Sequence, residues 1–82
     1  MHRYLIDERD VNMGNEDSWT LVVNGALDDA HVHHWWSHRH GQYEFKSGSA
    51  DLSLAEFKQK DARRYERVTA KLREIGFRGA IP

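Results

Sequence analysis

The segment between Ser53 and Gly76 constrains the fold of this chain more than any other. Ser53 and Glu56 have the spacing of a capping box, in which the serine side chain accepts from the backbone and the glutamate reaches back. Gly76 suits the left-handed residue that follows the end of a helix. Between these signals, apolar residues recur at steps of three and four. We therefore predict one long C-terminal helix over residues 54–75, with an apolar stripe of Leu54, Phe57, Tyr65, Val68, Leu72 and Ile75.

The chain is short and contains no cysteine. Its 82 residues predict a single domain, residues 1–82, whose core is so small that few side chains must fill it. Without cysteine, the sequence can form neither disulfides nor thiolate metal sites. No segment has the pattern of a secretory signal, and no apolar run is long enough to cross a bilayer, so we expect a cytoplasmic protein that does not enter membranes.

Three short segments before the predicted helix have the composition of strands. Residues 3–6 and 19–23 are rich in apolar, β-branched or aromatic side chains, and residues 42–46 alternate polar with apolar. The polar residues 11–18 and 47–49 suit loops. The predicted fold is therefore α+β, a small antiparallel sheet covered on one face by the long helix. The expected core contains Leu5, Leu21, Val23, Phe45, Phe57, Val68, Leu72 and Ile75, together with Trp19 or Trp36.

Residues 31–40 have the most unusual composition, with five histidines and two tryptophans. The flanking residues favour a shorter helix over residues 28–39. Asp28 and Asp29 would lie in its first turn, basic residues in its last turn, and Gly41 would end it, as helix dipole and capping preferences require.

The alternative for this segment is a strand in a hairpin. The chain would then turn near Gly41 and place Trp36 opposite Phe45 and His38 opposite Tyr43. In either conformation the two adjacent tryptophans point in different directions. One is therefore expected in the core and the other at the periphery, where an exposed indole suits a contact with a partner.

Charge is distributed unevenly along the chain, although the formal net charge is only −1. Acidic side chains dominate residues 1–30, and basic side chains dominate the remainder. A basic stripe on the predicted helix would suit a partner that carries carboxylates or phosphates. The alternative is a solvated helix face, neutralised by acids of the same domain. The stripe spans about 100° and comprises Lys60, Arg63, Arg64, Arg67 and Lys71.

Two chemical alternatives use the histidines. On a helix, His31, His34 and His38 would share one stripe and could bind zinc or nickel. Asp61 falls in the middle of the apolar stripe and needs a partner there. Together with His34 and His38, it could support acid–base catalysis in a small metal-independent ribonuclease. Structural hydrogen bonds are the commoner use of such groups, and we expect no cofactor and no resident metal.

The opening Tyr4-Leu5-Ile6-Asp7 is followed by Arg9 and by a polar segment with asparagine, glycine and glutamate. This pattern resembles the start of a small phage-encoded anti-CRISPR family that acts on type I systems. The resemblance implies a compact α+β inhibitor without catalytic machinery, which blocks a nucleic-acid-handling complex. It is confined to the amino-terminal residues, and it transfers no functional residue to this chain.

These observations together predict a non-enzymatic binding or inhibitor protein. Its expected partner is a protein or ribonucleoprotein complex with an acidic surface, and nucleic acid is a second candidate. An aromatic residue and neighbouring arginines often dominate the energetics of such interfaces. The expected contact residues are Trp35, Trp36, His38, Arg39, Lys60, Arg63, Arg64, Arg67 and Lys71.

Overall fold

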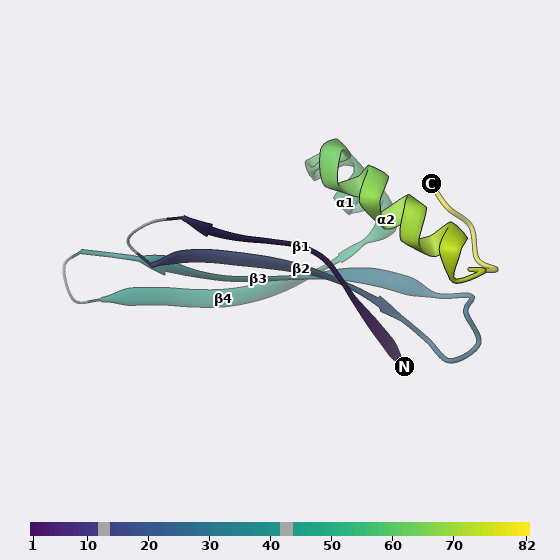
Figure 1. The fold of residues 1–82 in the computed structure, drawn as a ribbon, viewed down its shortest axis with the longest axis horizontal. Helices are drawn as coiled ribbons and strands as arrows, with labels where there is room; N and C mark the ends of the chain where they lie inside the picture. Colours follow the sequence, from purple (N-terminus) through teal and green to yellow (C-terminus); the bar gives the residue numbers. More distant parts are fainter. Residues whose placement is uncertain (12–13, 42–43) are drawn as a thin grey trace.

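A computed structural model of the chain describes residues 1–11, 14–41 and 44–82. Its four strands form one antiparallel sheet, in which each strand pairs with the next along the chain. Two helices follow and lie on one side of the sheet (Figure 1). The predicted α+β class with an antiparallel sheet is therefore confirmed. The elements are β1 (His2–Val11), β2 (Asn15–Val23), β3 (Ala30–Arg39), β4 (Phe45–Ser53), α1 (Leu54–Lys60) and α2 (Ala62–Glu74).

Alternation of side chains gives the sheet two different faces. On the helix side, Leu21 of β2 pairs with Val32 of β3, which pairs in turn with Leu52 of β4. These three apolar side chains are buried under the helices. The other face, here called the open face, carries the side chains that alternate with them. No described element covers the open face (Figure 1).

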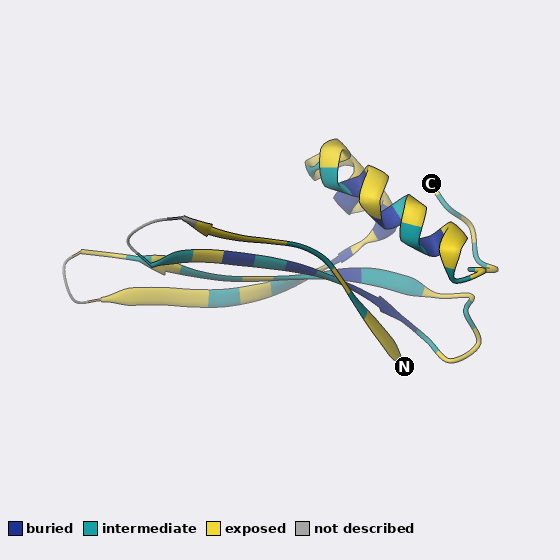
Figure 2. Ribbon diagram, in the orientation of Figure 1, coloured by how far each residue is buried: buried dark blue, intermediate teal, exposed yellow. Residues whose placement is uncertain are grey.

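The core occupies only one end of the sheet. The molecule measures 46 × 23 × 18 Å, and the two short helices cover the sheet near the ends of β2 and β4 (Figure 1). Buried residues gather beneath them, whereas the far end of the sheet is largely exposed (Figure 2). The core cluster comprises Trp19, Leu21, Val23, Val32, Leu52, Leu54, Phe57, Tyr65, Val68 and Leu72.

Most of the predicted core residues lie in this cluster, including Trp19 rather than Trp36. Ile75 is half-buried and packs against the cluster. Leu5 and Phe45 were predicted wrongly, because each is 58% exposed. The strand register places both on the open face, opposite Thr20 and Arg39, where no helix covers them.

The single helix predicted over residues 54–75 is divided at Asp61. This residue ends α1 and begins α2, with φ −148° and ψ 74°, values outside the helical region. Its side chain accepts from the backbone N–H of Arg64 at 3.1 Å, which caps the second helix. The break lets Phe57 of α1 and Tyr65 of α2 both face the core.

The ends of the helical region follow the prediction. Ser53 and Glu56 form the complete capping box. Gly76 has φ +74°, and the N–H of Phe77 donates to the carbonyl of Leu72 at 2.9 Å. This bond, with the 3.3 Å bond from Gly76 to Arg73, makes the Schellman ending that the sequence indicates.

Residues 28–39 do not form the favoured helix. Residues 30–39 are strand β3, which lies between β2 and β4, so both of its edges find backbone partners. The hairpin alternative was correct about the strand but wrong about its register. Trp36 pairs with Gly48, and His38 pairs with Lys46; Tyr43 lies outside the described residues.

Other strand boundaries differ from the predictions because the strands are longer. The segment predicted at 3–6 extends to Val11, and the segment at 19–23 begins at Asn15. Much of the predicted loop 11–18 is therefore strand, and so is the predicted loop 47–49 within β4. Residues 12–13 and 42–43 lie outside the described part. Neither helix of the described chain has the length and apolar character that a membrane span requires.

Candidate functional site

The helix side of the sheet, beyond the helices, is organised around one buried carboxylate. Asp17 on β2 is only 4% exposed. Its Oδ2 accepts from Nη2 of Arg9 at 2.8 Å. Its Oδ1 lies 3.0 Å from Nε2 of His34 and 3.2 Å from Nε2 of His38. The strands create this cluster, because Arg9 on β1 is directly opposite Asp17 and the two histidines share one face of β3.

Asp17 stays ionised despite its burial. Burial raises the pKa of this carboxyl, but the hydrogen bonds from Arg9, His34 and His38 outweigh burial and lower the pKa from 3.8 to about 2. An ionised carboxylate can only accept hydrogen bonds, so Nε2 of each histidine carries the proton. Those two nitrogens are therefore already engaged with Asp17.

A row of aromatic rings lies beside this cluster. The rings of Trp19 and His34 stack with centroids 4.7 Å apart and planes 12° apart. Trp36 lies next, with its centroid 5.4 Å from that of His34 and its plane tilted by 50°. Gly48 on β4 makes room for Trp36, because a Cβ atom at Gly48 would lie 2.7 Å from Cζ2 of the indole.

Arg64 connects the helices to this row. Its guanidinium carbon lies 3.7 Å from the centroid of the Trp19 ring. Its Nε donates to Asp7 and its Nη1 to Asp61, both at 2.9 Å. Burial lowers the pKa of Arg64, but these two carboxylates raise the pKa above its ordinary value. The arginine therefore stays charged while its side chain covers the buried tryptophan.

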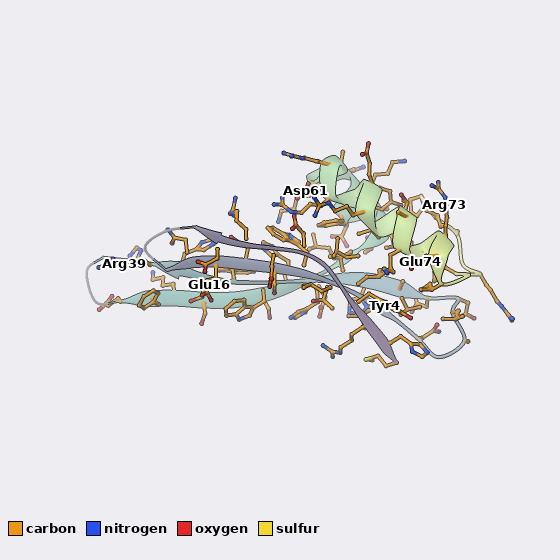
Figure 3. The ribbon with its side chains drawn as sticks, in the orientation of Figure 1. Tyr4, Glu16, Arg39, Asp61, Arg73 and Glu74 are labelled. Carbon is orange, nitrogen blue, oxygen red and sulfur yellow. The ribbon has the colours of Figure 1, made fainter. Side chains whose placement is uncertain are left out.

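A small pocket opens where α1 meets the sheet. Its volume is about 150 Å³, and Lys60 and Asp61 form its helix side (Figure 3 labels Asp61 at the junction of the helices). We use the name "corner" for this pocket together with the adjoining sheet surface of Trp36 and His38. The corner thus places the rings of Trp19, His34 and Trp36 beside a helix wall of Phe57, Lys60 and Asp61, in which Lys60 is the cation. The pocket is lined by Trp19, His34, Leu52, Phe57, Lys60 and Asp61.

The predicted basic stripe divides into two groups. Arg64, Arg67 and Lys71 have acidic partners: Arg67 lies 3.2 Å from Asp7, and Lys71 lies 2.7 Å from Glu74. These pairs neutralise part of the stripe. Two of them use Asp7, which belongs to the acidic amino-terminal third of the chain. Lys60 and Arg63 are exposed, and no ion pair joins either to an acid of the described chain.

The other predicted contact residues are divided between the two faces. Trp36 is half-buried and His38 exposed on the helix side. Trp35 is 38% exposed, and the alternation of β3 places it on the open face. Arg39 lies at the far end of β3 (Figure 3), where its Nε donates to the carbonyl of Gly41 at 3.0 Å. The predicted contact residues therefore do not form a single surface.

The chemical alternatives are only partly assembled. His31 lies on the opposite face of β3 from His34 and His38, so the predicted three-histidine stripe does not exist. Within the described residues, no group of three or more histidine or acidic side chains has the geometry to hold a metal ion. His34 and Asp61 do line the same pocket. The carboxylate that His34 and His38 share is Asp17, however, and Asp61 is bonded to Arg64.

A second histidine–carboxylate pair lies on the open face. Nδ1 of His33 is 2.6 Å from Oδ1 of Asp51, and Nε2 of His31 is 3.6 Å from the same oxygen. The hydrogen bond from His33 is the main reason that the pKa of Asp51 is lowered from its usual value. Asp51 is well exposed, so this pair is less constrained than the cluster around Asp17.

Sequence reasoning missed Asp17 and Arg9 because it interpreted residues 11–18 as a loop. One signal could have revealed Asp17: it lies two residues before Trp19, at the spacing that puts side chains on the same face of a strand. A carboxylate in line with Trp19 and Leu21 must find buried partners.

Comparisons of the chain with protein-family models, curated proteins and solved structures gave no match.

Proposed function

We propose that this chain is a non-enzymatic binding protein that docks through the corner on an acidic surface of a partner protein. Such a partner is either a separate protein or a protein component of a protein–nucleic-acid complex. One observation carries the proposal: the exposed cation Lys60 borders the pocket of the corner beside the rings of Trp19 and His34, and the exposed Arg63 follows three residues later at the start of α2. Tryptophan and arginine are enriched at the energetic centres of interfaces, and an exposed lysine beside them adds charge complementarity with an acidic partner.

The state of the histidines supports binding over catalysis. Each Nε2 already donates to Asp17, and Asp17 is also held by Arg9. This arrangement fixes the orientation of both imidazoles, so the floor keeps one shape before a partner arrives. A preorganised surface loses less conformational entropy on binding.

Charge favours a protein partner over bare nucleic acid. The formal net charge of the chain is −1, whereas proteins that bind duplexes tightly usually carry a basic domain. The far end of the sheet also bears exposed Glu8, Asp10 and Glu16. These carboxylates would repel a long phosphate backbone that ran along the sheet. An inhibitor of a nucleic-acid-handling complex, the class implied by the amino-terminal resemblance, would be one protein of this kind.

The proposal is tested by reversing the charge of Lys60, which borders the pocket of the corner, and of the neighbouring Arg63; neither has an ion pair with an acid of the described residues. We expect Lys60→Glu with Arg63→Glu to abolish capture of a protein partner from the native host by the tagged full chain, because carboxylates would replace both positive charges at the junction of the helices. The matched control is Arg73→Glu with Arg78→Glu, which changes the net charge equally at exposed positions; Figure 3 shows Arg73 on the side of α2 away from the sheet. The control should retain capture, and both variants should melt like the wild type.

Equal loss of capture in both double variants would contradict docking through the corner, since net charge alone would then explain the result. Arg64 and Arg67 are unsuitable for this test because their ion pairs with Asp7 contribute to the fold. The ribonuclease alternative is tested in parallel with labelled RNA. Turnover that disappears in a His34→Ala variant, with or without EDTA, would replace the binding proposal by an enzymatic one.

A further inference from the structure

The open face carries the exposed apolar side chains of the strands. Leu5, Trp35 and Phe45 are 58%, 38% and 58% exposed. Strand register places all three on this face, on β1, β3 and β4 respectively. The helices lie on the other side of the sheet (Figure 1). The register separates the three side chains along and across the strands, and Trp35 is the one of them that borders a depression.

Trp35 lies among small side chains on this face. Its direct neighbours across the strands are Ser18 on β2 and Ser49 on β4. Small neighbours leave the indole accessible from the side of the sheet. The indole borders a depression of about 460 Å³, within the usual size range of a ligand site, and lined by Glu8, Arg9, Asp10, Glu16 and Trp35.

The charge of the depression identifies the kind of group that would fill it. Asp10 and Glu16 are directly opposite each other on adjacent strands, a like-charge pair that destabilises a sheet. Glu8 lies two residues before Asp10 on the same face of β1, opposite Ser18. No ion pair joins any of these three acids to a cation of the described chain. The guanidinium of Arg9 is turned to the other face, where it donates to Asp17.

We propose that this depression binds an arginine side chain presented by a basic segment of a partner protein. A guanidinium stacks on an indole face and donates in pairs to carboxylates, so Trp35 and the opposed acids Asp10 and Glu16 suit it together. Such a guest would also remove the repulsion between those two acids. A second copy of this chain is the less suitable occupant, because it would bring its own Glu8, Asp10 and Glu16 toward the same carboxylates.

The proposal concerns the side of the sheet opposite the corner and requires a partner of opposite charge. It is tested with the full chain and a short fluorescent peptide of alternating arginine and serine, by fluorescence anisotropy at low salt. We expect the wild type to bind the arginine peptide and to bind a glutamate–serine peptide at least tenfold more weakly. Trp35→Ala should weaken binding of the arginine peptide about fivefold, the loss expected when a cation–π contact is removed.

Glu16→Gln keeps the shape of the depression and tests the charge independently of Trp35, in case Trp35→Ala perturbs the fold. It should weaken binding several-fold, whereas Glu66→Gln, an exposed acid on α2, should leave the affinity unchanged. The proposal is overturned if the arginine peptide does not bind, if Trp35→Ala and Glu16→Gln bind like the wild type, or if Glu66→Gln weakens binding equally. Sedimentation of the wild type as a dimer that Trp35→Ala dissociates would identify the second copy as the occupant instead.

Discussion

Replacing Asp17 by asparagine should destabilise the fold in a way that depends on pH. The pKa of Asp17 is about 2 in the folded chain against an ordinary value of 3.8. Each pKa unit corresponds to about 1.4 kcal/mol, so the ionised carboxylate stabilises the fold by about 2 kcal/mol at neutral pH. The loss should be at least this large, because the asparagine amide would place a donor where Arg9, His34 and His38 all donate.

The sign of the pH dependence follows from the lowered pKa. Between the folded and the ordinary pKa the unfolded chain binds more protons, so the contribution of Asp17 falls as pH falls. It should be complete near pH 5 and fall to about 1 kcal/mol or less near pH 2.5. Urea unfolding followed by tryptophan fluorescence at several pH values measures this for the wild type and Asp17→Asn.

Glu66→Gln, which alters an exposed acid on α2, is the control and should unfold like the wild type at each pH. The two stability curves of wild type and Asp17→Asn should therefore converge on acidification. A difference that stays constant from pH 5 to pH 2.5 would refute the argument, since it would show that the ionised state of Asp17 is not what stabilises the cluster. A difference below about 0.5 kcal/mol at pH 5 would refute it too, because losses of that size are ordinary for surface positions.

Two local contacts give further predictions. Gly48→Ala should cost about 1–3 kcal/mol and alter tryptophan fluorescence, because its Cβ would lie 2.7 Å from the Trp36 ring. A Cβ atom at Gly25 would meet nothing within 4 Å, so Gly25→Ala should change thermal stability far less. An equal loss of stability in the two variants would argue against the Trp36 contact. Ser53→Ala should lower stability in urea by about 1 kcal/mol through loss of the capping box. No change in its unfolding midpoint would mean that the cap contributes nothing to the fold.

Local chemistry made the helix ends predictable. Ser53, Glu56 and Gly76 satisfy or end the helical backbone within a few residues of themselves. The position of Asp61 within an apolar stripe also indicates that its carboxylate needs a partner. The sequence pattern does not indicate that the helix breaks at Asp61, because the break depends on how α1 and α2 both pack on the sheet.

The strand β3 shows where local signals are insufficient. Asp28, Asp29 and Gly41 agree with helix capping rules, yet residues 30–39 are extended. Histidine and tryptophan occur on both faces of this strand, so its side chains give no clear period of two. What decides the conformation is the presence of β2 and β4 on either side, which satisfy its backbone hydrogen bonds.

The candidate surfaces also depend on the extended conformation of β3. A helix would have put His31, His34 and His38 on one stripe, whereas the strand separates His31 from the other two. It also sends Trp35 to the open face and Trp36 to the corner. The ion pairs of Arg64 and Arg67 with Asp7 join residues far apart in sequence. Lys60 and Arg63 have no such partner among the residues that the structure describes. No pattern along the chain contains that information.

Composition, capping residues and apolar spacing were enough to establish an α+β domain with a capped helical end and most of its core, because each of those properties arises from neighbours along the chain. The order and register of the strands, the break at Asp61, and the burial of Asp17 among Arg9 and two histidines were decided by contacts between distant segments. Whether a side chain is buried, paired or exposed depends on which segment packs over it. The register of backbone pairing across the sheet determines which face each side chain occupies and therefore which segment covers it.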